Sequence, residues 1–227
     1  MMRGIAFPLI LGLGGLAILL SLGFWQLRRL EWKEAVIAEI SARIEAAPVA
    51  LATVTDPEPK TQLYLPVTVS GATTGEELLV LSGQKGVGAG YEVIAAFETD
   101  AGRRMLIDRG FIGEEARDAP RPPVALSITG NLHWPQEADA YTPPPDTTTG
   151  LWFARDVAAM AESLKTDPLM VVIRKAEGDA QGIVPRPVDT SGIVNDHLEY
   201  AITWFSLAGV WAGMTLYLLW RIRRRTI

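Results

Sequence analysis

Two long apolar runs stand near opposite ends of a chain that is otherwise rich in polar residues. Ile5–Leu27 and Tyr200–Trp220 have 23 and 21 residues, and neither run contains a charged side chain. About 20 apolar residues allow a helix to cross a bilayer. The pattern predicts transmembrane helices over residues 5–27 and 200–220, a domain of residues 28–199 between them, and short ends at residues 1–4 and 221–227.

Between the two runs the hydrophobic period changes from helical to alternating. Arg28–Ala47 lacks proline and glycine and carries apolar residues at helical spacing, so the first helix is expected to continue outward until Pro48. From Leu63 onward, short alternating runs predict strands. These expected strands cover residues 64–71, 77–82, 91–97, 104–109, 124–130 and 169–173.

Turn signals separate the expected strands. Gly83–Gly90 is interpreted as a turn, because it lacks the lysine and the following helix of a phosphate-binding loop. Thr99–Arg103 predicts a hairpin turn, and Asp156–Leu164 predicts a short helix. Several short strands with turns between them are typical of an antiparallel, barrel-like β domain. The expected fold class is therefore membrane α+β, with two transmembrane helices flanking a β domain that carries short helices.

Charge separates along the chain. Residues 31–199 hold all 26 acidic residues and 14 of the 21 basic ones, a net charge of −12. Such a domain would repel a phosphate backbone, so nucleic acid is not an expected partner. Basic residues collect on the cytoplasmic side of membrane proteins, so Arg221–Arg225 places the C-terminus in the cytoplasm and the acidic domain outside. Arg28 and Arg29 run against this rule, because they follow the first span on its outer side.

The inventory of reactive side chains argues against several kinds of site. The chain has no cysteine, which removes disulfides and thiolate ligands and argues against delivery of copper(I). No Ser-His-Asp or paired-carboxylate arrangement stands out, so an enzyme is not expected. His133 is interpreted as a surface residue of a loop. Asp108-Arg109-Gly110 is interpreted as a strand end with Gly110 in a turn, ahead of the alternative of an arginine aimed at an acidic group.

The other histidine, His197, stands at the entrance to the second apolar run. An imidazole there can bind a metal ion or a haem iron. Tryptophan and tyrosine favour the membrane interface in any case. The residues alone therefore support iron binding and a plain interfacial belt equally. The stripe that shares a helix face with the histidine consists of Tyr200, Ala201, Trp204, Ala208 and Trp211.

Small residues on both runs predict that the two membrane helices pair. Gly209-x-x-x-Gly213 and Ala17-x-x-x-Ser21 permit close helix contact. Pairing would bring Trp25 and His197 to the same outer rim. Arg28 and Arg29 would then lie about one turn further out, where guanidinium groups meet haem propionates or lipid headgroups.

The order of several short motifs resembles that of the surfeit locus protein 1 family, which are assembly factors for cytochrome c oxidase. Each motif is weak by itself, and their order between two membrane spans carries the resemblance. The motifs are Phe24-Trp25-Gln26-Leu27-x-Arg29, Tyr64-Leu65-Pro66-Val67, Arg109-Gly110-Phe111-Ile112, Leu151-Trp152-Phe153-Ala154-Arg155-Asp156 and His197-Leu198-x-Tyr200-Ala201-Ile202-Thr203-Trp204-Phe205.

The resemblance implies a protein of the bacterial inner membrane, or of mitochondria, whose central domain lies in the periplasm. It implies help in inserting haem a into the haem–copper subunit of the oxidase, with haem a synthase as a further partner. The family's haem-binding histidine corresponds to His197. Rim geometry adds Trp25, Tyr200 and Trp204 as aromatic neighbours of the haem and Arg28 and Arg29 as propionate partners. The alternatives are a membrane scaffold that never binds haem and an unrecognised membrane enzyme.

Overall fold

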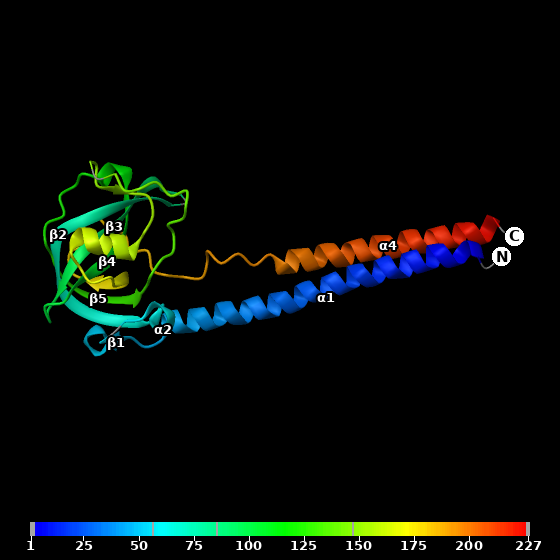
Figure 1. Cartoon of the computed structure of the whole chain (residues 1–227), viewed down its shortest axis with the longest axis horizontal. Coiled ribbons are helices and arrows are strands. Elements are labelled where there is room, and N and C mark those ends of the chain that lie inside the picture. The colour runs from blue at the N-terminus through cyan, green and yellow to red at the C-terminus, as the bar shows by residue number, and fades with distance from the viewer. Residues whose placement is uncertain (1–2, 56, 85, 147, 226–227) are drawn as a thin grey trace. The chain divides into compact units, whose positions relative to one another are not determined.

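The computed structural model describes residues 3–55, 57–84, 86–146 and 148–225, and it divides the chain into two units (Figure 1). Ile40–Asp189 forms a β domain, and the described residues up to Glu39 and from Thr190 onward form a helical unit. Two helices are long and apolar enough to cross a membrane, over Ile5–Glu45 and His197–Arg224. Both helices coincide with the apolar runs for which the sequence predicted membrane spans.

The helical unit is an antiparallel pair of α1, Arg3–Glu45, and α4, His197–Arg225 (Figure 1). The expected extension of the first helix is confirmed, because α1 continues beyond the apolar run and ends shortly before Pro48. Helix α4 begins three residues before the apolar run at Tyr200. His197 therefore belongs to the first turn of the helix, directly beside the apolar stretch.

Contact between the two helices depends on glycines of α1 that face large side chains of α4. A Cβ atom added to Gly15 would lie 2.5 Å from the ring of Trp211, and one added to Gly23 would lie 2.6 Å from the ring of Phe205. The Nε1–H group of Trp211 donates to the carbonyl oxygen of Gly12 at 2.9 Å. The predicted pairing of the helices is thus confirmed, with glycine on one helix matched to aromatic rings on the other.

The prediction of which small residues make this contact is wrong. A Cβ atom added to Gly209 or Gly213 would meet nothing within 4 Å. Ala17 and Ser21 are exposed, and the Ser21 hydroxyl donates to the Ala17 carbonyl within its own helix. Small residues allow a close approach, but the bulky rings of the opposite helix decide which glycines are used.

Five strands of the β domain close into a barrel in the order β2-β3-β4-β7-β5, because β2 pairs with both β3 and β5. Two short strands, β1 and β6, pair in parallel with β2. The strands are β1 Val49–Ala50, β2 Pro66–Gln84, β3 Gly88–Thr99, β4 Arg104–Gly113, β5 Ala125–Leu132, β6 Leu151–Trp152 and β7 Met170–Glu177. The short helices are η1 Leu51–Thr53, α2 Pro59–Gln62, η2 Glu114–Ala116 and α3 Val157–Leu164.

The expected antiparallel barrel with short helices is confirmed, and one of its wall pairings is parallel. Strands β4 and β7 run in the same direction, because the connection between them includes β5 and α3. The two strands expected over residues 64–71 and 77–82 are one strand, β2, with an irregularity between Thr73 and Glu77. Gly75 lies inside this irregularity with φ +84°, which glycine adopts at little cost.

The prediction that Asp108-Arg109-Gly110 ends a strand is wrong. Strand β4 continues to Gly113, and Gly110 lies inside it with φ +112° beside a register shift between β3 and β4. A Cβ atom at Gly110 would lie 2.1 Å from the carbonyl oxygen of Val184, which crosses β4 there. The side chain of Arg109 contacts Gln181, since its Nη1 atom donates to the amide oxygen at 2.7 Å, and the alternative of an arginine aimed at an acidic group stays a prediction.

Alternate residues of the barrel wall enter two separate hydrophobic clusters. Phe97, Met105 and Ile107 belong to the cluster that includes residues of β2, β5 and β7. Ile94 and Leu106 belong to the cluster under α3, where they meet Met160. Both faces of β3 and β4 are therefore buried. Helix α3 begins where Asp156 caps it, since the carboxylate accepts from the backbone N–H groups of residues 158 and 159 at 3.1 Å.

Candidate functional site

The candidate site is the imidazole of His197, which faces Gln26 of α1. The Nδ1 atom of His197 lies 2.7 Å from the Oε1 atom of Gln26, at hydrogen-bonding distance. The Gln26 side chain is 8% exposed, and His197 is half-buried. A buried amide is costly without a hydrogen-bond partner, so this contact stabilises the helix pair at the point where α4 begins.

Packing on both sides of this contact holds the two helices close together. Ala201, one turn after His197, is 1% exposed against α1. On α1, Phe24 meets Phe205 edge to face, with ring centroids 5.3 Å apart. The backbone positions of Gln26 and His197 are therefore fixed by apolar contacts that do not involve either polar side chain.

The structure brings together some of the predicted site residues and leaves others at the surface. Trp204 is half-buried on the face that α4 turns toward α1, whereas Tyr200 is 55% exposed. Trp25 is 47% exposed, and the recorded polar contact of His197 comes from the next residue, Gln26. Arg28 and Arg29 are exposed, and the guanidinium of Arg29 lies 4.5 Å from the centre of the Trp32 ring.

Sequence reasoning missed Gln26 as a site residue, although a signal was present. Glutamine is the side chain with the largest hydrogen-bonding demand in the uncharged run Ile5–Leu27. Polar side chains inside a membrane segment are costly and commonly serve a function. The sequence thus marks Gln26 as unusual in its helix, and the structure supplies its partner, His197.

A second group of buried polar side chains lies in the β domain and centres on Arg155. Its Nη1 atom donates to Asp108 Oδ2 at 2.8 Å, and its Nε atom donates to Glu137 Oε1 at 3.0 Å. Asp108 is 1% exposed and also accepts from the backbone N–H of Gly110 at 3.1 Å. Burial alone would lower the pKa of Arg155, but the two carboxylates raise that pKa, so the guanidinium stays charged.

Glu92 of β3 lies close to this group and is held by Arg186. The carboxylate accepts hydrogen bonds from the guanidinium, which also donates to the Ser82 hydroxyl at 3.0 Å. Burial, together with the negative charge of Asp108, raises the pKa of Glu92 to about 7. The pair joins the segment after β7 to the outside of the barrel.

His133 is half-buried, so its interpretation as a surface residue is wrong. The ring stacks on Tyr64 with centroids 5.4 Å apart, and burial followed by the charge of Arg155 lowers its pKa to about 4. Its Nδ1 atom is buried and has no hydrogen-bond partner among the described residues. In those same residues there is no cluster of three or more His, Asp or Glu side chains that could hold a metal ion.

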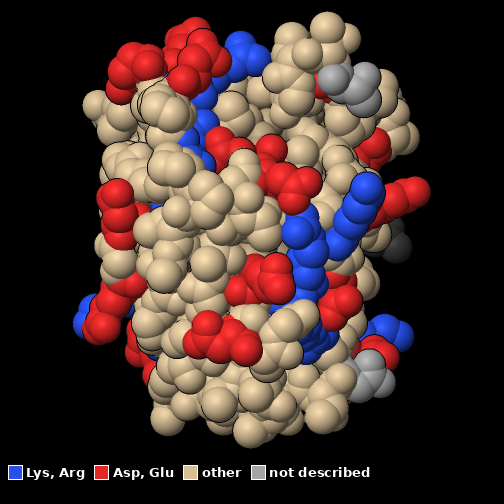
Figure 2. All heavy atoms as spheres, turned by 90° about the vertical axis from the view of Figure 1, so that its left-hand side faces the viewer, with Lys and Arg blue, Asp and Glu red and all other residues tan. Residues whose placement is uncertain are grey.

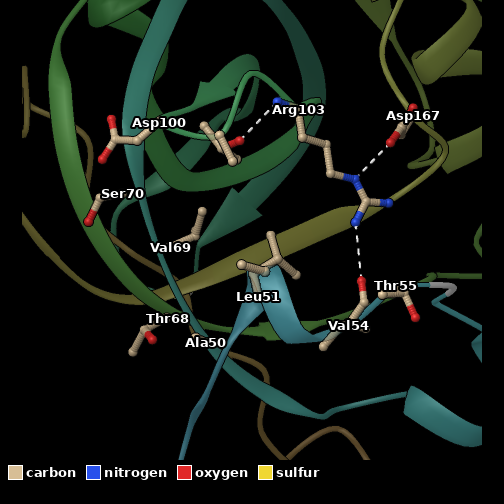
Figure 3. A pocket seen from close by; sticks show the side chains of 13 residues that line it. Ala50, Leu51, Val54, Thr55, Thr68, Val69, Ser70, Asp100, Arg103 and Asp167 are labelled. Carbon is tan, nitrogen blue, oxygen red and sulfur yellow. Dashed lines mark hydrogen bonds and ion pairs between the residues drawn. The ribbon is translucent and has the colours of Figure 1, made fainter.

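A groove of about 700 Å³ in the β domain lies beside β2 and contains none of the predicted site residues (Figure 3). Two of the charged side chains that line it, Arg103 and Asp167, pair with each other. Arg103 bonds Asp167 through Nε at 2.7 Å and reaches toward the carbonyl oxygen of Val54 through Nη1 at 3.5 Å (Figure 3).

On the face of the domain shown in Figure 2, acidic side chains are spread over several places next to basic ones. This distribution is that of an ordinary solvated surface.

Comparison with known proteins connects this architecture to one family. The family model described as the SURF1 family matches residues 13–209. The SURF1-like protein of Rickettsia felis is 26% identical over 225 residues, which cover 92% of this chain and 93% of that protein. Surfeit locus protein 1 of Xenopus tropicalis is 29% identical over 214 residues, with 82% and 67% covered. Surfeit locus protein 1 of Homo sapiens is 28% identical over 215 residues, with 83% and 69% covered.

Proposed function

This chain belongs to the SURF1 family, and we propose that it assists the assembly of cytochrome c oxidase by holding haem a at the rim of its helix pair. Membership of this family implies a role in the assembly of the oxidase rather than in catalysis. In this proposal His197 ligates the iron before the haem passes to the haem–copper subunit. When bound, the haem would supply an iron atom that the imidazole of His197 would hold.

One observation carries the proposal, namely the 2.7 Å contact between His197 Nδ1 and Gln26 Oε1. This contact engages one ring nitrogen with the protein and leaves the other nitrogen as a candidate ligand. Histidines that bind metals commonly use the second ring nitrogen for such a hydrogen bond. A single histidine supplies one strong axial ligand, so binding weak enough for handover is expected, as a chaperone requires.

The surroundings of His197 suit a flat, largely apolar cargo with two acidic groups. Trp204 on the same face of α4, with Tyr200 and Trp25, would shelter the macrocycle. The exposed guanidinium groups of Arg28 and Arg29 would pair with propionates, because planar donors bind carboxylates in a bidentate manner. These roles extend the proposal and rest on position along the two helices.

We also propose the membrane in which the protein lies and its orientation there. Basic residues after the second span favour a cytoplasmic C-terminus, and two spans then place residues 28–199 on the periplasmic side of a bacterial inner membrane. Expected partners are the haem–copper subunit of the oxidase, haem a synthase and the surrounding lipid. Nucleic acid is not an expected partner, since residues 31–199 carry a net charge of −12.

The test uses cells whose only copy of the protein carries His197→Ala, with His133→Ala as the matched control. The oxidase is purified from each strain, and its haem a content per haem–copper subunit is measured. His197→Ala is expected to lower the haem a content while the variant remains in the membrane at wild-type abundance. Equal haem a content in wild type and His197→Ala would favour the alternative, a scaffold that stabilises an oxidase assembly intermediate without binding haem.

A further inference from the structure

We propose that Gln26 is a positioning residue, which fixes the tautomer of His197 so that Nε2 carries the free lone pair. In this arrangement the Nδ1–H group of His197 donates to the side-chain oxygen of Gln26, across the 2.7 Å contact. The consequence for iron binding rests on the proposed function. The assignment of the tautomer concerns the protein without haem and stands independently.

The burial of Gln26 is the first argument. Gln26 is 8% exposed, and the preceding turn of its helix carries leucine, glycine, phenylalanine and tryptophan. Removing an amide from water without a hydrogen-bond partner is unfavourable. His197 is the partner recorded for its oxygen. The amide oxygen and the imidazole therefore satisfy each other at the point where α4 begins.

The chemistry of the two groups is the second argument. A neutral imidazole has one nitrogen that donates and one that accepts. An amide oxygen can only accept, so its partner Nδ1 must carry the hydrogen, and Nε2 is left as an acceptor with a lone pair. Outer partners of this kind orient the ring and raise the basicity of the ligating nitrogen. The reverse orientation of the amide would leave Nε2 protonated and unable to ligate iron.

The third argument is that the geometry is preorganised. Gln26 follows Gly23 by one helical turn, and Phe205 packs directly on Gly23. Ala201, one turn after His197, is 1% exposed. These contacts place both side chains before any cargo arrives. The hydrogen bond therefore requires no rearrangement of the helix pair when the other ring nitrogen is used.

Nuclear magnetic resonance of ¹⁵N-histidine can measure the tautomer directly, because the chain contains only two histidines. The full chain is labelled, placed in lipid nanodiscs without haem and recorded above pH 7. A His133→Gln variant assigns the two imidazoles. The wild type is expected to show His197 with the hydrogen on Nδ1. The tautomer is then measured in Gln26→Leu, which removes the acceptor, and in Gln26→Glu, which keeps one.

Three outcomes are informative in this experiment. Gln26→Leu is expected to abolish the preference for Nδ1–H, Gln26→Glu to keep it, and the control Ser21→Ala, an exposed polar residue of the same helix, to leave it unchanged. A wild type with the hydrogen on Nε2 would overturn the inference, and so would a tautomer that is identical in Gln26→Leu. If Gln26→Leu does not fold, retention in Gln26→Glu and the wild-type tautomer still decide the question.

A haem a titration of the same variants separates this inference from the proposed function. Gln26→Leu is expected to weaken binding on the order of 10- to 100-fold, as loss of an outer-shell partner typically does. Gln26→Glu is expected to retain binding and lower the midpoint potential of the bound haem, since a carboxylate makes the imidazole more electron-rich. Absence of binding in the wild type would overturn the proposed function and leave the tautomer result standing.

Discussion

The helical unit and the β domain differ in the partners of their buried polar side chains. In the β domain, Arg155 joins two carboxylates, and one of these, Asp108, is 1% exposed. In the helical unit, the amide of Gln26 meets the imidazole of His197 through one recorded hydrogen bond. In the β domain, charged side chains pair with one another. In the helical unit, the recorded hydrogen bond of His197 uses only one of its two ring nitrogens.

This difference shows where binding chemistry is to be sought. A buried network whose members all face one another fixes the local structure, because breaking it leaves an unpaired charge. A half-buried imidazole held at one nitrogen has a second nitrogen with which to bind. We therefore propose that Asp108, Arg155 and Glu137 stabilise the β domain and that His197 is the residue that binds the cargo.

The largest expected effect comes from breaking the closed network. Arg155→Met keeps the length of the side chain but leaves Asp108 buried without its cation, which typically costs about 3–5 kcal/mol. The free energy of unfolding of the β domain, measured with urea on the full chain in detergent, is expected to fall by that amount. Haem a binding is expected to survive wherever the domain stays folded.

An exposed ion pair provides the control for this variant. Arg103 and Asp167 pair at 2.7 Å, but their side chains are 29% and 51% exposed. Arg103→Met is expected to cost less than about 1 kcal/mol, as exposed pairs usually do. Equal losses in Arg155→Met and Arg103→Met would contradict the structural role given to the network.

The next effect is a pH dependence in which two buried groups oppose each other. The pKa of Glu92 is 4.5 in the unfolded chain and about 7 in the folded one. The contribution of Glu92 to stability is therefore complete below pH 4.5 and is lost as the pH rises to 7. The pKa of His133 falls from 6.5 to about 4, so its contribution is full above pH 6.5 and is lost as pH falls to 4. The two slopes are expected to cancel largely between pH 4.5 and 6.5.

Two single variants separate the contributions of Glu92 and His133 to the pH dependence of stability. In Glu92→Gln the stability of the β domain is expected to rise with pH across this window, and in His133→Gln it is expected to fall, by up to about 3 kcal/mol. Thermal unfolding followed at several pH values measures both. Below pH 4.5, carboxyls such as Glu137 add their own slopes, since partial desolvation raises its pKa but Arg155 lowers that pKa overall. Identical pH profiles in all three proteins would rule out this pair of titrations.

A smaller effect is expected from the contact between the membrane helices. Gly15→Leu pushes a side chain into the ring of Trp211, whereas Gly14→Leu adds the same apolar volume where a Cβ atom meets nothing within 4 Å. Overpacking of this kind costs about 1–3 kcal/mol. Gly15→Leu is therefore expected to weaken pairing of α1 with α4, and Gly14→Leu to preserve it.

Disulfide cross-linking can measure this pairing, because the chain has no cysteine of its own. A Cβ atom at Gly12 would lie 3.1 Å from the Cβ atom of Thr215, so Gly12→Cys with Thr215→Cys places two thiols within reach. Cross-linking is expected to slow in the Gly15→Leu background alone. Equal rates with Gly14→Leu would show that the glycine contact does not hold the pair.

Local patterns were enough to predict most elements of the fold. The two apolar runs predicted the membrane helices, and alternation predicted most of the strands because each wall residue faces one of two layers. Asp156 marked the start of α3 through its capping oxygen. What local pattern could not predict was the path of β4 past Gly110, because its conformation is set by contact with Val184, which is distant in sequence.

The candidate site was predictable in part. The position of His197 before an apolar run was visible, and so was the tendency of the helices to pair. The face used for pairing depends on which glycine of α1 lies opposite Trp211 and Phe205, and spacing on one helix cannot show that. The partner of His197 lies 171 residues away, so the role of Gln26 needed the structure.

The account rests on ligation of haem iron by His197. Its most direct test is a haem a titration of the purified full chain in detergent, followed by visible spectra, for wild type, His197→Ala and His133→Ala. We predict a bound spectrum in wild type and His133→Ala that is lost in His197→Ala. The same bound spectrum in all three proteins would contradict His197 as the ligand and would place the haem elsewhere in the chain.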